Sequence, residues 1–219
     1  MNERIAEISL RKQGLHTIED RYEEYHALVQ HRMAPYFKAA GVRYPPTNLV
    51  LVAIKQTKEL QVYASSGAVP LHFIRTYKIL AASGTAGPKV REGDKQVPEG
   101  VYNIEKLNPN SMFHLALRVQ YPNQFDVEQA NAEIRTNLGT DIMIHGSDRS
   151  VGCLAMGNEA IEDLFIVGAE VGAPKIKLII TPVDFRKGLP LPSDTKLYPW
   201  SQELYAHIKQ DLLALPPEP

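Results

Sequence analysis

The sequence predicts a mainly β domain with added helices, an α+β fold, preceded by a helical N-terminal segment. Over residues 4–37, apolar residues recur at three- and four-residue steps, the spacing of an amphipathic helix. From residue 48 onward, short runs of β-branched and aromatic residues alternate with turn signals rich in Gly, Ser and Pro. The length of 219 residues supports one full-sized core, so we expect one main domain.

The helical pattern of the N-terminal segment is regular, and Gly14 interrupts it once. Gly41 and the pair Pro45-Pro46 then end it, because these residue types stop helices. We predict one helix or a pair of helices, whose apolar stripe packs either on the rest of the chain or on a second copy. The stripe consists of Ile5, Ile8, Leu15, Ile18, Tyr22, Tyr25, Val29, Met33 and Phe37.

The next part of the chain predicts an antiparallel meander of three strands, over residues 49–56, 59–64 and 72–80. Residues 83–100 are rich in glycine and hold two prolines, which indicates a long ordered loop or a pair of tight turns. A strand-like run over residues 101–104 follows.

The second half of the chain continues with mixed elements. We expect a strand over residues 113–120, then a polar excursion over 121–139 that is long enough to act as a lid. Residues 141–146 read as a buried strand that ends at His145. The remaining expected elements are a helix over 159–167 capped by Asn158, a strand over 175–183, and a terminal helix capped by Ser201.

Composition excludes several classes of function. The 24 basic and 25 acidic residues nearly cancel, which argues against nucleic acid as a partner, because phosphate binding needs clustered positive charge. We expect no transmembrane segment, since no run of about 18 apolar residues occurs, and no export signal is visible. We divide the chain into a helical segment over 1–45, the main domain over 46–185, and a C-terminal extension with a helix over 186–219.

Reactive residues gather in the segment IMIHGSDRSVGCLAM, where His145 precedes the single cysteine, Cys153, by eight residues. A thiolate nucleophile needs a base within hydrogen-bond reach, and a loop of this length can fold the imidazole back onto the thiol. Gly152 permits close approach of a substrate, so the amides of Gly152 and Cys153 would face a developing oxyanion. The alternative is a small buried side chain beside an unrelated histidine.

The string IHGSDRSVGCLAM resembles the active-site motif of the YkuD-type L,D-transpeptidases, an Ile-His-Gly followed by a Ser-x-Gly-Cys loop. It most resembles the YafK-like subgroup, in which the His-to-Cys interval is short and a Met follows the Cys by three. GPKVREGDKQVPEGVY and LNPNSMFHLALRVQYPNQFD resemble two further motifs of the family, so the resemblance spans residues 49–181. Val151 and Ala155 stand where many members carry a second His and an Arg, which leaves substrate preference open.

The resemblance implies a twisted β-sandwich or open barrel as the catalytic domain, with one helix after the Cys loop. It implies a transferase in which Cys153 is the nucleophile and His145 the base. The enzyme would form an acyl-enzyme with a peptidoglycan stem peptide at meso-diaminopimelate and transfer it to an amine acceptor, without a cofactor. Two alternatives stay open: a hydrolase of the same chemistry, either an L,D-carboxypeptidase or an amidase, and a non-catalytic murein-binding domain.

The same resemblance implies a periplasmic location in a Gram-negative bacterium and a role in cell-wall organisation and cell shape. In the family pattern, the carbonyl group of Gly146 orients Nδ1 of His145, so that Nε2 takes the thiol proton. Ser150 either bonds within its loop or lines the oxyanion site together with Gly152.

Four residues are candidates for substrate binding, and each has a structural alternative. Arg118 suits a carboxylate of diaminopimelate, or lies on the wet face of a half-buried strand. Tyr121 contacts the peptide or packs the base of the lid, and Lys89 holds substrate or only decorates the glycine-rich loop. Arg149 binds substrate or is an exposed loop residue. The histidine spacings support no metal site, because no HExxH or Cys-His pattern occurs.

Overall fold

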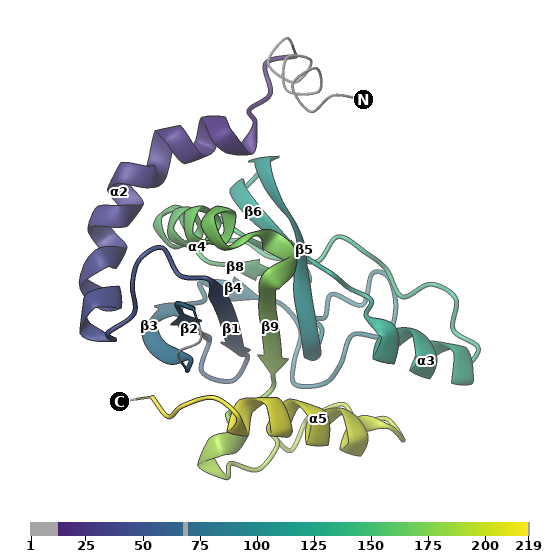
Figure 1. Cartoon of the computed structure of the whole chain (residues 1–219). Coiled ribbons are helices and arrows are strands. Elements are labelled where there is room, and N and C mark those ends of the chain that lie inside the picture. The colour runs from purple at the N-terminus through teal and green to yellow at the C-terminus, as the bar shows by residue number, and fades with distance from the viewer. Residues whose placement is uncertain (1–12, 68–69, 219) are drawn as a thin grey trace.

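The computed structural model describes residues 13–67 and 70–218. In this part of the chain, nine strands form one curled sheet in the order β3-β2-β1-β9-β5-β6-β7-β8-β4. Helices lie against the sheet, and the N-terminal helix runs along one side of the molecule (Figure 1). The predicted α+β class is confirmed, while the helical pattern predicted before residue 13 lies outside the described residues.

One half of the sheet is built on the predicted meander. Strands β1 (Asn48–Ile54), β2 (Glu59–Ser65) and β3 (His72–Lys78) pair antiparallel in sequence order, which confirms the prediction. On its other edge, β1 pairs in parallel with β9 (Ile176–Thr181). This half of the sheet therefore consists of well-paired strands.

The other half of the sheet carries the segment singled out for chemistry. Strand β5 (Gly100–Ser111) joins the halves, since its first residues pair with β9 and its later residues with β6 (His114–Val119). Strand β6 pairs antiparallel with β7 (Met143–His145), and β7 pairs in parallel with β8 (Leu154–Ala155). The short β4 (Ala81–Ala82) closes this edge.

Helices cover both faces of the first half of the sheet. Along β1, alternate side chains enter two different cores: Leu51 packs in the cluster that contains residues of the N-terminal helix, and Val52 in the cluster that contains the C-terminal helix. The sheet is thus the middle layer of three (Figure 1). The helices are α2 (Ile18–Ala39), α3 (Gln124–Ala132), α4 (Asn158–Val171) and α5 (Ser201–Leu213), with 3₁₀ turns η1 (Ala173–Lys175) and η2 (Phe185–Lys187).

The apolar stripe of α2 packs on the same chain. Thr17 caps this helix by a reciprocal pair of hydrogen bonds with Asp20, and Met33 and Phe37 are buried in the core shared with α4. Arg32 forms an ion pair of 2.7 Å with Asp163 of α4, whose carboxylate is fully buried. Within the described residues, intramolecular docking is therefore the arrangement observed.

Two predicted helix caps are wrong by one residue. Helix α4 begins at Asn158 after Gly157, and the Asn158 side chain accepts a hydrogen bond from the amide of Ser147 instead. Helix α5 begins at Ser201, whose hydroxyl accepts from the amide of Tyr198. In both places the side chain bonds a preceding loop amide rather than the first turn of its helix.

The polar excursion predicted over residues 121–139 contains a helix that the sequence analysis did not predict. Helix α3 starts at Gln124, and Asn123 caps it by a reciprocal pair of hydrogen bonds with Asp126. Apolar periodicity could not reveal it, because only Asp126 and Ala130 of its residues are buried. A lid function for this segment stays a prediction.

Candidate active site

His145 is held by the sheet on both sides. It ends β7, where its backbone is paired with Ala116 of β6 and with Ala155 of β8, and only 2% of the residue is exposed. Nδ1 lies 2.6 Å from the carbonyl oxygen of Gly146, the contact that the family resemblance implied. Because a carbonyl oxygen only accepts, we assign the hydrogen to Nδ1, which leaves the lone pair of the neutral imidazole on Nε2. Nε2 is thus the nitrogen able to act as a base.

Cys153 lies immediately before β8, and strand register relates it to His145. Leu154 pairs with Ile144 and Ala155 with His145, so Cys153 directly precedes the residues that pair with β7. The Cys153 residue is partly exposed, and its Sγ donates a weak hydrogen bond of 3.6 Å to the carbonyl oxygen of Asp141. The fold therefore brings the Cys153 loop beside β7, the strand that ends at His145.

The electrostatic surroundings favour the uncharged form of both groups. Burial lowers the pKa of the His145 imidazole, and the hydrogen bond to Gly146 opposes this shift only in part. Burial also raises the pKa of the Cys153 thiol, and the negative charge of Asp141 adds to this shift, while a hydrogen bond with the Met143 backbone and the positive charge of Lys89 oppose it. At neutral pH the site therefore rests as thiol and imidazole rather than as an ion pair.

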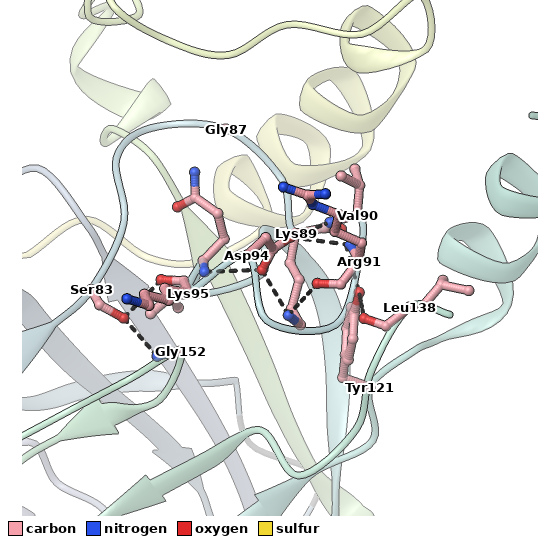
Figure 2. Close-up of polar contacts among 12 residues, drawn as sticks. Ser83, Gly87, Lys89, Val90, Arg91, Asp94, Lys95, Tyr121, Leu138 and Gly152 are labelled. Carbon is pink, nitrogen blue, oxygen red and sulfur yellow. Dashed lines mark hydrogen bonds and ion pairs between the residues drawn. The ribbon is translucent and has the colours of Figure 1, made fainter. Parts of the chain in front are cut away.

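The two backbone amides that were expected to face an oxyanion both donate hydrogen bonds to serine hydroxyl groups. The Gly152 amide donates to Oγ of Ser83 at 2.6 Å, and this hydroxyl donates in turn to the carbonyl oxygen of Lys95 at 2.8 Å (Figure 2). The Cys153 amide donates to Oγ of Ser150 at 3.0 Å, and that hydroxyl donates to the Cys153 carbonyl oxygen at 2.5 Å. Ser150 thus bonds within its loop, one of the two alternatives.

Sequence reasoning missed Ser83. Its contact with Gly152 joins the start of the glycine-rich loop to the nucleophile loop across 69 residues of sequence. No local spacing signals such a contact. The only available hint was a hydroxyl residue at the start of the glycine-rich stretch over residues 83–100.

The side chains of Lys89 and Tyr121 both form hydrogen bonds within the protein. The ammonium group of Lys89 is buried and lies 2.7 Å from the Asp94 carboxylate and 2.8 Å from the Arg91 carbonyl oxygen. The Tyr121 hydroxyl donates to the carbonyl oxygens of Lys89 and Leu138, each at 3.3 Å (Figure 2). These contacts favour the structural alternatives for both residues: Lys89 closes its loop and Tyr121 packs the base of the 121–139 segment.

Arg118 pairs with a residue that contacts the Cys153 thiol. Its guanidinium group bridges the carboxylates of Glu105 at 3.0 Å and Asp141 at 3.1 Å, and 26% of its side chain is exposed. Asp141 is also the residue whose carbonyl oxygen contacts the thiol. Arg149, by contrast, is exposed on the loop before Cys153.

The described residues hold no group of three or more His, Cys, Asp and Glu side chains arranged to bind a metal ion. Across this same part of the chain, every helix is too short or too polar to cross a membrane.

Comparisons with known proteins place these features in a family. The model of the YkuD family, described as the L,D-transpeptidase catalytic domain, matches residues 47–174. A protein of Escherichia coli K12 named "Putative L,D-transpeptidase YafK" is 35% identical over 133 residues, 58% of this chain and 51% of that protein. The chain thus spans about half the length of the curated relatives it matches.

Solved structures show more distant likenesses. The K307A mutant of the helical cell shape determining protein Pgp2 from Campylobacter jejuni is 20% identical, with a TM-score of 0.49 over 81% of this chain and 60% of that chain. L,D-transpeptidase 1 of Mycobacterium tuberculosis is 14% identical, with a TM-score of 0.36 over 61% of this chain and 62% of that chain. Since the family match covers more than half of its 219 residues, this chain belongs to the YkuD family of L,D-transpeptidase catalytic domains.

Proposed function

We propose that this chain is a cysteine L,D-transpeptidase that acts on peptidoglycan stem peptides. The observation that carries the proposal is the pairing of β7 with β8, which brings the Cys153 loop beside the strand that ends at His145, and from it we infer that thiol and imidazole face each other. The hydrogen bond from Nδ1 to Gly146 supports it, because this bond leaves Nε2 as the proton acceptor. A partly exposed thiol is also what a nucleophile requires.

The reaction follows from these positions. Nε2 of His145 takes the thiol proton as Sγ of Cys153 attacks the carbonyl carbon of the bond after meso-diaminopimelate. The tetrahedral intermediate collapses to a thioester, and the imidazolium returns its proton to the departing amine of the terminal D-residue. An amine of a second stem peptide then attacks the thioester, loses its proton to His145, and regenerates the thiol.

The oxyanion of the intermediate needs hydrogen-bond donors near Cys153. The amides of Gly152 and Cys153 remain our candidates, although hydroxyls accept from both in the resting state. A carbonyl oxygen of the substrate would therefore replace the Ser83 hydroxyl at the Gly152 amide. Ser83 is able to leave, because its hydroxyl also bonds the carbonyl oxygen of Lys95.

Arg118 is the substrate contact that we propose beyond the catalytic pair. Its partner Asp141 has a side chain that is 65% exposed, so a carboxylate of diaminopimelate is able to replace it at low energetic cost. A guanidinium group binds a carboxylate by two parallel hydrogen bonds, which also orients the substrate. The stem peptide would then lie across β6 towards the thiol.

The organisation of the chain enters the proposal as well. We assign catalysis to residues 46–185, with the segments over 1–45 and 186–219 as flanking support. The expected substrate implies a location outside the cytoplasm, in the periplasm of a Gram-negative bacterium, and a part in cell-wall organisation.

A direct test compares wild type with Cys153→Ala on purified muropeptides. We expect Cys153→Ala to lose all turnover while its unfolding temperature stays close to that of wild type, because a nucleophile is lost and little core volume. Val151→Ala is the matched control on the same loop: this residue is 74% exposed, so the rate should not change. Cross-linked products indicate transfer and free acids indicate hydrolysis. Wild-type turnover by Cys153→Ala would overturn the proposal.

A further inference from the structure

An aromatic side chain lies on the face of the His145 imidazole. The ring of Phe113 stacks on it with a centroid separation of 4.7 Å and an angle of 28° between the ring planes. Phe113 belongs to the turn that joins β5 to β6, and the residue is still 40% exposed. The family motifs drew attention to this region for Arg118, and Phe113 received no role from them.

Two restraints of different kind therefore act on the imidazole. The hydrogen bond from Nδ1 to the Gly146 carbonyl oxygen acts in the ring plane, and the stacked ring acts from one face. A hydrogen bond alone leaves the ring able to tilt about the axis of that bond. We propose that Phe113 is a positioning residue for His145, which keeps Nε2 aimed at the thiol of Cys153. This inference rests on the proposed function.

The turn that carries Phe113 is itself firmly anchored. His114 adopts a left-handed backbone with φ of +76°, which is uncommon for a residue other than glycine. Nε2 of His114 lies 2.9 Å from the carboxylate of Glu162 on α4, and Glu162 also binds Arg32 of α2 at 3.0 Å. The N-terminal helix thus contributes to the fixed position of the turn.

The turn also packs against the other restraint. A Cβ atom added to Gly146 would lie 2.5 Å from the carbonyl oxygen of Phe113, closer than real Cβ contacts allow. The backbones of Gly146 and Phe113 are therefore in direct contact. Because Gly146 and Phe113 pack against each other, the hydrogen bond and the stacked ring restrain the imidazole jointly.

The stacked ring also acts during the reaction. When His145 takes the thiol proton it becomes a cation, and the face of an aromatic ring attracts cations. An aliphatic side chain of similar size would keep the apolar cover but would lose this attraction. Stacked aromatic pairs contribute about 0.5 to 1.5 kcal/mol, which corresponds to a rate factor of about two to twelve.

The test compares Phe113→Leu with Phe113→Tyr, because the first removes the ring and the second keeps it. With a stem peptide as substrate, we expect Phe113→Leu to lower kcat about two- to twelvefold with little change in KM, and Phe113→Tyr to retain the wild-type rate. Met112→Ala is the matched control in the same turn, since Met112 is 93% exposed, and should also retain the rate.

A second readout is independent of turnover. In nitrogen-15 NMR of histidine-labelled protein, the Nδ1 hydrogen of His145 should exchange slowly in wild type and in Phe113→Tyr. It should exchange faster in Phe113→Leu, whose imidazole is held by one restraint. If neither wild type nor any variant shows acyl transfer but this exchange difference is found, the positioning role stands and the proposed function fails. Unchanged exchange in Phe113→Leu would overturn the positioning role, whatever happens to the rate.

Discussion

The proposed base, His145, and the proposed nucleophile, Cys153, are held in different ways. His145 has strand partners on both sides, so its place is determined by backbone pairing in the sheet. Cys153 lies in a loop whose amides are bonded by the hydroxyls of Ser83 and Ser150. The position of His145 therefore depends on the pairing of the whole sheet, whereas the position of Cys153 depends on a few side chains.

This contrast suits the chemistry. A base must present one nitrogen in one direction, and a rigid strand does this well. A nucleophile must move towards a carbonyl carbon as its bond forms, and a loop held by side-chain hydrogen bonds tolerates such a shift. Each of these bonds contributes only about 0.5 to 1.5 kcal/mol to stability.

The largest effect is expected from the sheet-held base. His145→Gln should lower the rate of Cys153 acylation by a β-lactam about 100- to 10,000-fold, because general base catalysis is lost. The rate is measured by intact-mass spectrometry at increasing times. His72→Gln, at an exposed position of β3, is the control and should acylate normally. A normal rate in His145→Gln would mean that another group accepts the proton.

Arg118 connects the two regions, since it lies on β6 and pairs with Asp141, which contacts the thiol. Arg118→Lys should lower kcat/KM for the stem peptide about ten- to a hundredfold, because a charge-assisted bond is worth roughly 1.5 to 3 kcal/mol and Lys lacks the planar pair of donors. Acylation by a small β-lactam without the matching carboxylate should change much less. Equal losses for both would indicate that Arg118 acts on the thiol through Asp141.

A pair of glycine substitutions sharpens the contrast through stability. Gly146→Ala should lower the free energy of unfolding by about 1 to 3 kcal/mol, because its Cβ would press on the Phe113 carbonyl oxygen. Gly152→Ala should lower the free energy of unfolding by about 1 to 2 kcal/mol, because Gly152 has a φ of +88°, which strains a residue with a side chain. The added Cβ would meet no atom closer than 3.6 Å, so no steric clash is added to this strain.

Urea unfolding measures both glycine variants. Gly41→Ala, with a φ of +68° and no neighbour within 4 Å, is the matched control for backbone strain alone. Gly152→Ala should resemble this control in stability, and Gly146→Ala should also lose acylation rate because the turn that holds the imidazole moves. A harmless Gly146→Ala would show that the base side is looser than we describe.

The smallest effect concerns pH. Burial lowers the pKa of His145 below its usual value near 6.5, so the neutral base persists when the pH falls somewhat below that value. Burial raises the pKa of the Cys153 thiol, so thiolate should not add to the rate near neutral pH. We expect a flat profile of acylation rate through neutral pH, with an acidic limb below about 6.5. An acidic limb above that value would contradict this environment.

The lowered pKa of His145 also makes the stability of the fold depend on pH. Its pKa is lower in the folded state than in the unfolded chain, so the unfolded state binds more protons as the pH falls below about 6.5. The imidazole should therefore contribute stability above that pH, and the contribution should be lost progressively below it.

Much of the sheet was predictable from the sequence, because alternation and turn signals act over short distances. The meander over β1 to β3 was found in this way, and so was the strand that ends at His145. Helix α3 was missed, because it buries too little apolar surface to leave a periodic pattern. The caps at Asn158 and Ser201 were misplaced, because their side chains had loop amides as competing partners.

The sequence could point to the candidate residues of the site but not to the side chains that contact them. Cys153 and His145 stand out as residue types at a feasible spacing, and family motifs add Gly146. Ser83 and Phe113 reach the site from distant segments of the chain, and only the folded sheet brings them there. Contacts of this kind depend on strand order, which local patterns do not encode.

If Cys153 is the nucleophile that forms a thioester with His145 as its base, a carbapenem should acylate it. Intact-mass spectrometry of the protein after incubation with a carbapenem measures this acylation, with wild type beside Cys153→Ala. We expect one covalent adduct per wild-type chain, located on the peptide that contains Cys153, and none in the variant. An unmodified wild-type protein, or the same adduct in Cys153→Ala, would contradict the claim.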